Sequence, residues 1–486
     1  MWQKEMTVMM DNKDTSPRIT RTEWTSFGRV DLVETDNPLF KTLFIDGGAG
    51  TKMIEMRDGK VRPAVAESLL FSYMGGVPLL IVEQEDKQKA AVIGSGGGID
   101  VVTLLLADYK KIDAVEINPD FIRLVRDESE YNGGLYNGHP RVTVYNDEGR
   151  SFLRDQDEDY NLILMGLPII KSSRNFTNHS LTENYLFTQD AFAEYLEALE
   201  PGGFLIVIAH YPNELKRLFS NAVKSVSDKY NISESIATQH IATIGDDRNP
   251  TLILKNGVFS PGEVNGLRAI LTNLPVSGSV NFIPFSGEFT GEVLFDRGMV
   301  ALSRNEIDLS QFIDAHNEDI SWVTDDSPFF YQMTKKLPSE LRTVLLTVFV
   351  LTAGAVIGFI LSRRNESQNF PTWNSLMMFL SFGCIGIGFM MVEIEMIQMF
   401  TVFWHHQTKA LSVVLASILA AAGTGSLLSS RIKNTKTFSA VMGLLLILQV
   451  LYAFYADDVL AGAAVLPPIW KIPVTLGLVA PLFVLM

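Results

Sequence analysis

A glycine-rich turn between an apolar segment and a helical segment is the part of this sequence best suited to bind a nucleotide. Residues 89–100 read KAAVIGSGGGID and contain Gly94, Gly96 and Gly98. Glycine lets the backbone pass close to a ligand, and the helix N-terminus that follows offers unpaired N–H groups. An acid about 20 positions further on, Glu116, ends the next apolar segment and is suited to accept hydrogen bonds from a ribose diol. These residues predict that the chain binds a molecule containing adenosine.

The spacing of the glycines distinguishes between two classes of cofactor. A dinucleotide-binding fingerprint needs a small third residue that allows close helix–strand packing, and Ile99 stands at that position. The crowded glycines at positions 96–98 are closer to the first loop of S-adenosylmethionine-dependent transferases. We therefore expect S-adenosylmethionine or its decarboxylated form rather than a nicotinamide dinucleotide. The residues of this region expected to contact it are Gly94, Gly96, Gly98, Asp100 and Glu116.

A pair of acids follows the third predicted strand, residues 142–146. Asp147 and Glu148 stand there, directly before the sequence GRSFL. Acids that follow neighbouring strands could hold the two ends of adenosine, with the ribose at Glu116 and the adenine amino group at Asp147 or Glu148. The alternative is that the pair only caps a helix and places an acid in its first turn.

The loop after the fourth predicted strand, residues 166–188, lies on the reaction side of such a sheet. A loop of about 20 residues in a compact domain is more often a functional lid than a plain connection. It offers Glu183 and Tyr185 as candidate catalytic groups and His179 as a candidate substrate contact. The alternative is that Thr182 caps a helix, with Glu183 in its first turn.

The elements expected around these residues alternate between strand and helix over residues 89–257, which is typical of a parallel sheet covered on both faces. Further strands are expected at 160–165, 204–209 and, antiparallel, 251–255; a helix is expected at 263–274, and residues 201–203 (PGG) are expected to break the helix before them. The sequence thus predicts an α/β Rossmann-like, doubly wound sheet of the class I methyltransferase kind, with a small β unit before it and an all-α transmembrane bundle after it.

Composition divides the chain. Residues 341–486 hold 8 Lys and Arg and 5 Asp and Glu, which leaves 32 basic and 50 acidic residues before them. So acidic a first part argues against binding of nucleic acid, because phosphate binding needs clustered Lys and Arg. The single cysteine, Cys384, excludes an intramolecular disulfide, and 7 scattered histidines give no metal-ligand spacing. The expected divisions are a polar segment 1–22, a β-hairpin domain 23–83, a nucleotide-binding domain 84–335 and a transmembrane domain 341–486.

The last part of the chain contains five apolar runs. Residues 343–361 are 19 residues without a charge, long enough to span about 30 Å of hydrocarbon. The other runs are 376–403, 410–428, 438–455 and 459–486. We expect four or five membrane spans, and because the sequence stops within apolar residues we expect a truncated product.

Two acids, Glu393 and Glu395, lie inside the second apolar run. A carboxylate within a membrane is costly unless it is neutral or paired, so it indicates a functional or structural contact. Residues two apart face different sides of a helix, and we expect Glu393 to make a polar contact within the bundle. The alternative is that both acids lie near the end of the span.

Eight short motifs carry a family resemblance. They are residues 43–47 (LFIDG), 94–98 (GSGGG), 115–119 (VEINP), 148–153 (EGRSFL), 181–188 (LTENYLFT), 201–203 (PGG), 324–331 (TDDSPFFY) and 388–398 (GFMMVEIEMIQ). With them, residues 25–335 resemble the spermidine/spermine synthase family, and the closer match is its integral-membrane branch, in which such a domain is fused to helical spans. The resemblance implies a transferase that uses S-adenosylmethionine or its decarboxylated form.

The sequence departs from that family where the amine is activated. Polyamine synthases carry an aspartate just after strand four that deprotonates the attacking amine, whereas residues 164–168 (LMGLP) contain no acid. Their Tyr-His pair is matched by Val65 and Ala66, and the aspartate of their glycine loop by Gly97. We therefore expect spermidine formation from putrescine to be absent or very slow, unless a carboxylate such as Asp46, a candidate substrate contact, takes over as the base.

The segment 324–331 stands about a dozen residues before the first apolar run. Asp325 and Asp326, beside three aromatic residues, are candidate catalytic acids that would close the crevice over the cofactor. The alternative is a turn capped by Asp325, with the aromatic residues in the core.

Two functions of different classes follow. The first is a membrane-anchored transferase that moves a methyl or aminopropyl group to a small-molecule or lipid acceptor; the second is a non-catalytic nucleoside-binding sensor coupled to a membrane bundle. Lys and Arg are balanced between the two sides of the predicted spans and do not decide orientation. Because S-adenosylmethionine is made in the cytosol, we place the soluble domain there. A homo-oligomer is left open.

Overall fold

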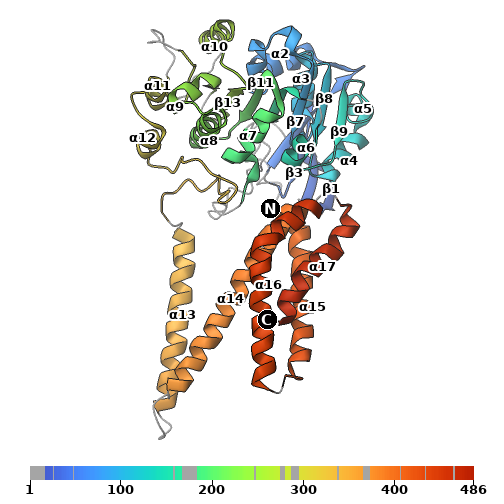
Figure 1. Cartoon of the computed structure of the whole chain (residues 1–486). Coiled ribbons are helices and arrows are strands. Elements are labelled where there is room, and N and C mark those ends of the chain that lie inside the picture. The colour runs from blue at the N-terminus through green and yellow to red at the C-terminus, as the bar shows by residue number, and fades with distance from the viewer. Residues whose placement is uncertain are drawn as a thin grey trace. The chain divides into compact units, whose positions relative to one another are not determined.

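The computed structural model describes residues 17–25, 27–47, 49–156, 159–166, 183–245, 248–273, 280–285, 295–336, 339–364, 373–404, 407–432, 434–463 and 466–485. The chain forms two compact units, Met1–Leu345 and Leu346–Met486, which are described one at a time (Figure 1).

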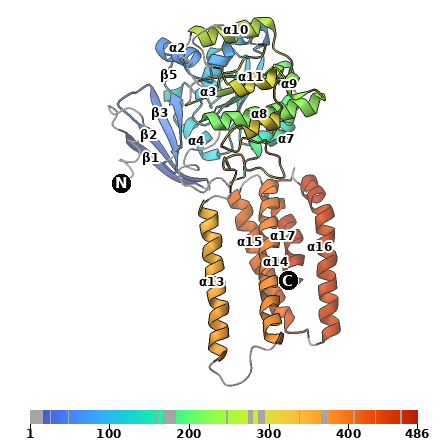
Figure 2. The ribbon, with the colours of Figure 1, turned by 90° about the vertical axis from the view of Figure 1, so that its left-hand side faces the viewer.

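The first unit begins with an antiparallel sheet of four strands in sequence order (Figure 2). The strands are β1 (Arg18–Thr25), β2 (Gly28–Glu34), β3 (Phe40–Ile45) and β4 (Ala49–Ile54), followed by the hairpin β5 (Met56–Arg57) and β6 (Lys60–Val61). The predicted β unit is therefore confirmed. Two details were wrong: β1 begins within the segment expected to be only polar, and residues 63–81 are largely helical, in α2 (Pro63–Phe71) and η1 (Val77–Ile81).

The strand β1 was not predicted because two charged residues, Arg21 and Glu23, stand on its half-buried face. Its residues alternate between exposed and half-buried, as expected of an edge strand with one face on the sheet. Arg21 on this strand binds Asp127 at 2.7 Å, and Arg18 binds Glu34 at 3.3 Å. These ion pairs account for polar residues in a strand that a search for apolar alternation misses.

A mixed sheet of seven strands follows, in the order β12-β13-β11-β10-β7-β8-β9. Its strands are β7 (Lys89–Ile93), β8 (Lys111–Val115), β9 (Val142–Tyr145), β10 (Tyr160–Gly166), β11 (Leu199–Ile208), β12 (Ile241–Ile244) and β13 (Thr251–Lys255). The strands from β7 to β11 pair in parallel, and β13 is antiparallel to β11, as predicted. The chain runs outward from β7 through β8 to β9 and returns to β10 on the other side of β7. The strand order therefore reverses between β7 and β10.

Helices cover both faces of this sheet, as its buried strands predicted. They are α3 (Ile99–Leu106), α4 (Pro119–Asp127), α5 (Ser129–Asn132), α6 (Gly149–Arg154), α7 (Gln189–Glu197), α8 (Pro212–Tyr230), α9 (Glu234–Ala237), α10 (Pro261–Asn273), α11 (Arg297–Ser303) and α12 (Leu309–Asp314), with short turns η2 (Gln84–Asp86), η5 (Tyr185–Phe187) and η6 (Thr238–His240).

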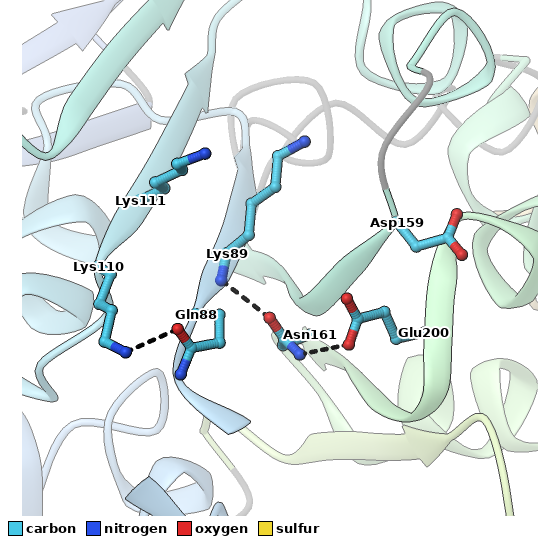
Figure 3. A pocket seen from close by; sticks show the side chains of 7 residues that line it. All are labelled: Gln88, Lys89, Lys110, Lys111, Asp159, Asn161 and Glu200. Carbon is cyan, nitrogen blue, oxygen red and sulfur yellow. Dashed lines mark hydrogen bonds between the residues drawn. The ribbon is translucent and has the colours of Figure 1, made fainter. Parts of the chain in front are cut away.

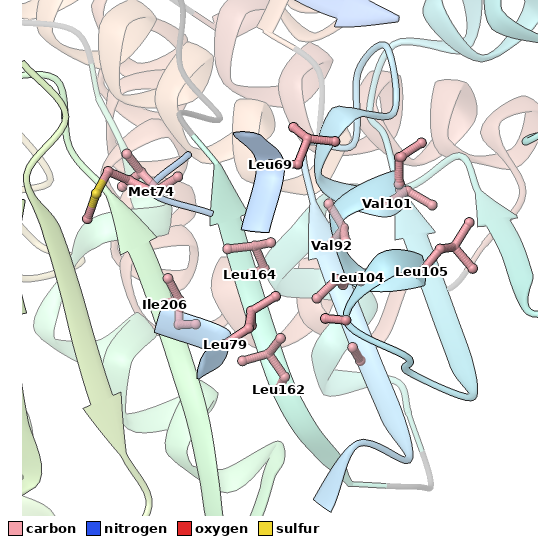
Figure 4. Close-up of a cluster of buried hydrophobic side chains, with 14 of the residues drawn as sticks. Leu69, Met74, Leu79, Val92, Val101, Leu104, Leu105, Leu162, Leu164 and Ile206 are labelled. Atoms are coloured by element: carbon pink, nitrogen blue, oxygen red, sulfur yellow. The ribbon is translucent and has the colours of Figure 1, made fainter. Parts of the chain in front are cut away.

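Alternate residues of each strand enter two separate cores. Val92, Leu164 and Ile206 pack with α3 and α10 on one face (Figure 4). Ile93 and Met165, one position further along their strands, pack with α6, α7 and α8 on the other face. Each core is a continuous cluster of buried side chains, so the sheet holds the carboxyl ends of its strands at fixed positions.

The expected helix break at residues 201–203 was wrong. Helix α7 ends at Glu197 and β11 begins at Leu199, so Pro201, Gly202 and Gly203 lie within a strand. The pairing of β10 with β11 shifts register there. Gly202 has φ +89°, a conformation that favours glycine, and it donates to the Asn256 carbonyl at 2.7 Å. The glycines thus serve a strand irregularity rather than a helix end.

The second unit is helical. It contains most of α13 (Ser339–Arg364), and α14 (Trp373–Trp404), α15 (Gln407–Ser429), α16 (Thr435–Ala463) and α17 (Pro468–Leu485). Three of its described stretches are long and apolar enough to cross a membrane: Ser381–Phe400, Lys409–Ser429 and Thr435–Ala456. The apolar parts of α13 and α17, Arg342–Gly358 and Ile469–Leu485, are shorter, so the expectation of four or five spans stays a prediction.

The polar residues of the second unit include a lysine that the bundle encloses. Lys471 is buried and donates to the Phe403 carbonyl at 2.9 Å, which satisfies a backbone group at the end of α14. Glu393 is half-buried and Glu395 is exposed. Of the two acids, Glu393 is thus the one turned toward the bundle.

One buried arginine holds the end of the first unit against α8. Arg217 is 1% exposed and donates to the carbonyls of Phe330 at 2.7 Å and Gln332 at 2.8 Å. Its guanidinium also lies 3.2 Å from the Asp319 carboxylate. Because these backbone carbonyls have no helix or strand to pair with, the arginine replaces the missing secondary structure.

We predict that Arg217→Ala lowers the free energy of unfolding by about 3 kcal/mol or more, because it leaves buried carbonyls unpaired. Thermal unfolding of the detergent-solubilised full chain measures the loss, and hydrogen exchange should show residues 319–332 opening first. Lys224→Ala, which removes an exposed ion pair from the same helix, is the control and should change stability by less than about 0.5 kcal/mol. Equal melting of the two variants would contradict the role assigned to Arg217.

Candidate functional site

The glycine turn lies between β7 and α3, at the carboxyl edge of the sheet where the strand order changes direction. Ligands of open α/β sheets bind at this edge. The N–H groups of Gly94 and Ser95 both donate to the Val115 carbonyl, at 2.9 and 3.0 Å. Gly94, Gly96 and Gly98 have φ of +76°, +48° and +92°, so the turn requires glycine at each of them.

Glu116 ties the turn to the end of β8. Its side chain is 6% exposed, and its two carboxylate oxygens accept from the N–H groups of Gly96 and Asn118, each at 2.9 Å. Burial raises the pKa of Glu116, and the backbone N–H groups oppose that rise. A carboxylate offers about four acceptor positions, so Glu116 keeps acceptor capacity for a ribose hydroxyl. The structure therefore brings Gly96 and Glu116 together, as the sequence predicted.

Asn118 is a site residue that the sequence analysis did not identify. Its Oδ1 caps α4 by accepting from the Asp120 N–H at 3.0 Å. Its Nδ2 is buried and has no hydrogen-bond partner among the described residues. A buried donor without a partner is costly, and one two residues from Glu116 is placed to bind a polar group of a ligand. Its signal in the sequence is the acid-x-Asn-Pro pattern at the start of α4.

The acidic pair after β9 divides between two roles. Glu148 caps α6, where its carboxylate accepts from the N–H groups of Arg150 at 3.1 Å and Ser151 at 2.9 Å. The capping alternative therefore describes Glu148. Asp147 is exposed, and its Oδ1 accepts from the Glu148 N–H at 2.8 Å. Asp147 therefore stays the candidate of this pair for contact with an adenine amino group.

The N-terminal sheet covers the glycine turn. The Gly97 N–H donates to Thr51 Oγ1 on β4 at 2.9 Å. A Cβ at Gly97 would lie 2.6 Å from the Lys52 carbonyl oxygen, which forbids any side chain there. Gly97 is therefore required by the approach of β4, and no carboxylate can stand at this position of the turn.

Asp100 stands in the first turn of α3 and is 2% exposed. Its Oδ1 accepts from Tyr73 Oη at 2.6 Å. Burial raises the pKa of Asp100 to about 6, and the hydrogen bond from Tyr73 lowers it. A Cβ at Gly166, the last residue of β10, would lie 2.0 Å from Asp100 Oδ2. The carboxylate thus lies at the end of β10, beside the glycine turn.

The candidate residues of the loop after β10 are only partly described. His179 lies outside the described residues. Glu183 Oε2 accepts from Tyr185 Oη at 3.2 Å, and burial raises the pKa of Tyr185. Thr188 provides the N-cap of helix α7, accepting from the Ala191 N–H at 3.1 Å. Thr182 lies outside the described residues, and the alternative that placed Glu183 in the first turn of a helix is wrong, because Glu183 precedes every helix of this segment and α7 begins at Gln189.

Asp325 is held by an arginine from a distant part of the chain. Arg150 is buried and binds Asp325 at 2.7 and 2.8 Å and Glu194 at 2.6 and 2.7 Å. Thr188 Oγ1 also donates to Asp325, at 2.7 Å. These bonds lower the pKa of Asp325 although burial opposes them. The carboxylate is fully engaged in joining α6, α7 and the segment after α12.

The neighbours of Asp325 also take structural positions. Asp326 is exposed, whereas Phe330 is buried and packs against Phe187 with the two rings tilted and their centroids 4.9 Å apart. Phe330 therefore belongs to the core and Tyr331 packs against it, as the alternative interpretation stated for the aromatic residues. Arg150 was part of the quoted EGRSFL motif, but nothing in the sequence linked it to an acid 175 positions away.

Asp46 lies in the hairpin turn between β3 and β4. It is exposed, adopts φ +48° between β3 and β4, and its Oδ1 accepts from the Arg29 N–H at 2.9 Å. Asp and Asn tolerate this left-handed conformation in turns. The LFIDG motif therefore has a local structural reason in this chain.

A cavity of about 430 Å³ lies at the opposite edge of the sheet (Figure 3). It is lined by Gln88, Lys89, Lys110, Lys111, Asp159, Asn161 and Glu200, near the amino ends of β7, β8, β10 and β11. Its side chains bind one another: Lys110 donates to Gln88 at 2.7 Å, and Asn161 to Glu200 at 2.8 Å. This cavity shares no residue with the glycine turn, and we do not assign it to the candidate site.

Part of this chain is similar to a family of known proteins. Residues 69–245 match the family described as the spermine/spermidine synthase domain. A polyamine aminopropyltransferase of Streptococcus uberis is 30% identical over 172 residues, 35% of this chain and 55% of the relative. One of Sulfolobus acidocaldarius is 24% identical over 160 residues, 32% of this chain and 49% of the relative. The chain thus spans about half the length of these curated relatives.

Solved structures of similar proteins include a probable spermidine synthase from Corynebacterium glutamicum. It is 16% identical, with a TM-score of 0.38, over 53% of this chain and 89% of that chain. A spermidine synthase in complex with the transition-state analogue AdoDATO has a TM-score of 0.35 and 16% identity over 54% and 81%. The matched residues, 69–245, hold the glycine turn, Glu116 and Asp100, and in them this chain is similar to the spermine/spermidine synthase domain.

Proposed function

We propose that this protein transfers an aminopropyl group from decarboxylated S-adenosylmethionine to an amine. The observation that carries the proposal is the joining of Glu116 to the glycine turn within residues 69–245. The relatives that match this region are described as polyamine aminopropyltransferases, which favours aminopropyl over methyl transfer.

The residues present suit an adenosine-containing donor. Glu116 keeps acceptor positions for a ribose diol, and Asn118 Nδ2, which has no hydrogen-bond partner in the described part of the chain, offers a donor beside it. Asp147 is exposed at the end of β9, on the same edge of the sheet. Gly97 lets β4 lie directly over the turn, which would exclude water from the donor's aminopropyl end.

The acceptor is proposed to be a positively charged amine, held near the membrane. The first 340 residues carry 50 acidic and 32 basic residues, and a field of this sign raises the local concentration of cations. Three apolar helices support membrane association. We place the first unit in the cytosol, where the donor is made, and a lipid-borne amine is one acceptor of this class.

The nucleoside product identifies the reaction. Aminopropyl transfer breaks the bond between sulfur and the propyl carbon and leaves methylthioadenosine, whereas methyl transfer from S-adenosylmethionine leaves S-adenosylhomocysteine. We predict methylthioadenosine and an amine enlarged by one aminopropyl group when the detergent-purified chain is incubated with donor and a panel of amines, putrescine included.

Mass spectrometry of that mixture decides between the candidate functions. S-Adenosylhomocysteine, formed when S-adenosylmethionine is supplied, would replace the proposal with methyl transfer. Binding of the donor without any nucleoside product would favour the sensor, which the acid-free end of β10 supports.

We also predict that Glu116→Ala weakens binding of decarboxylated S-adenosylmethionine by roughly 1.5–3 kcal/mol, or about 10–100-fold in Kd, because it removes hydrogen bonds to a charged group. Glu130→Ala, which removes an exposed acid from α5, is the matched control and should bind as the wild type does. Calorimetry that gives the Glu116 variant wild-type affinity would take Glu116 out of the donor site.

A further inference from the structure

Asp100, which the sequence assigned to the cofactor, is a buried acid that lies apart from the other polar residues of the candidate donor site. Glu116, Asn118 and Asp147 lie at the ends of β8 and β9, whereas Asp100 faces the end of β10 on the other side of β7. Among the described residues its carboxylate has one hydrogen-bond partner, Tyr73 Oη at 2.6 Å. A carboxylate that accepts a single hydrogen bond while 2% exposed is expensive to keep charged. Asp325, by contrast, accepts two hydrogen bonds from the Arg150 guanidinium, which compensate its charge.

The backbone around Asp100 is shaped to admit its carboxylate. A Cβ at Gly166 would lie 2.0 Å from Asp100 Oδ2, and one at Gly75 would lie 2.9 Å from Oδ1. Any side chain at the end of β10 would therefore displace the carboxylate. The glycine at the end of β10, Gly166, and the acid on α3, Asp100, depend on each other. The space between them holds the Asp100 carboxylate and leaves no room for a side chain at Gly166.

We propose that Asp100 is the proton acceptor for the attacking amine and that Tyr73 is a positioning residue for it. This inference rests on the aminopropyl transfer proposed above and assigns a base to it. Asp100 occupies the point between the glycine turn and the end of β10, so it reaches the reaction side of the sheet from a helix instead of from the strand.

The step balances in atoms and charge. The acceptor amine enters as an ammonium and gives one proton to the Asp100 carboxylate. Its nitrogen lone pair then forms a bond to the propyl carbon, while the bond from that carbon to the sulfonium breaks and its electron pair stays on sulfur. The products are the enlarged amine, neutral methylthioadenosine and one proton, which leaves Asp100 for solvent.

The surroundings of Asp100 suit this role. The titratable groups that face it among the described residues are Tyr73, from the segment after α2, and Tyr136, from the segment after α5, which also feels Glu116. Burial raises the pKa of both tyrosines, so both stay neutral at physiological pH. Burial likewise raises the pKa of Asp100 to about 6. Asp100 is thus charged at neutral pH yet basic enough to take a proton.

The test compares Asp100→Asn, Tyr73→Phe and the control Glu130→Gln in the full-length detergent-solubilised chain, with methylthioadenosine release as the assay. Asp100→Asn should lower kcat by about 10²–10⁴-fold, the usual contribution of a general base, with donor affinity close to wild type. Wild-type kcat/KM should rise with pH through about 6 as Asp100 loses its proton. Tyr73→Phe removes the bond that lowers this pKa and should move that rise to higher pH. Glu130→Gln should change neither.

Thermal unfolding separates the chemical role from a structural one. When a carboxyl group has a higher pKa in the folded than in the unfolded protein, the folded protein becomes less stable as pH rises from the unfolded pKa to the folded pKa. A charged Asp100 therefore lowers the stability of the folded protein above about pH 6. Asp100→Asn should therefore melt no earlier than the wild type at neutral pH while turnover falls. An early-melting variant with proportional loss of activity would overturn the inference, as would unchanged kcat and pH profile. Absence of methylthioadenosine from the wild type with every amine would instead refute the proposed function.

Discussion

The close approach of three backbones at the glycine turn is the constraint on which the candidate site depends. N–H groups of the turn donate to the Val115 carbonyl at the end of β8 and to the Glu116 carboxylate. The turn also donates to Thr51 on β4, a strand of the N-terminal sheet. A side chain at Gly97 would strike the Lys52 carbonyl, so this geometry exists only with glycine there. Because the turn leads directly into α3, the same constraint fixes where Asp100 points. Donor binding and the proposed proton transfer are thus set by one piece of backbone.

Burial acts differently on the acids of this unit, and the difference follows from their partners. Asp325 faces a guanidinium and keeps a lowered pKa, Glu116 faces backbone N–H groups and has a raised one, and Asp100 faces one phenol and has a pKa of about 6. Carboxyl groups whose surroundings separate their pKa values can take different chemical roles on one fold. In this chain the acid with the least compensation is also the one placed at the end of β10.

Local patterns in the sequence were sufficient to predict the parallel strands, the turn, Glu116 and the antiparallel β13, because strand burial and glycine spacing are local signals. Long-range pairings were not predictable in this way. The Arg150–Asp325 pair, the cover of the turn by Thr51, and the contact of Asp100 with Gly166 all join residues far apart in the chain. Residues 201–203 were misread because the same Pro-Gly-Gly signal serves a helix end or a strand irregularity, and only the pairing with β10 decides. The prediction that the second unit spans a membrane rests on the length and apolar composition of its helices, and three stretches among the described residues are long and apolar enough.

A structure of the full-length protein bound to methylthioadenosine would show whether the glycine turn and Glu116 form the nucleoside site. Our account predicts the nucleoside at the carboxyl edge of β7 and β8, with its ribose hydroxyls within hydrogen-bond distance of the Glu116 carboxylate and Asn118 Nδ2. A nucleoside bound elsewhere, such as in the lysine-lined cavity at the amino edge of the same strands, would contradict it.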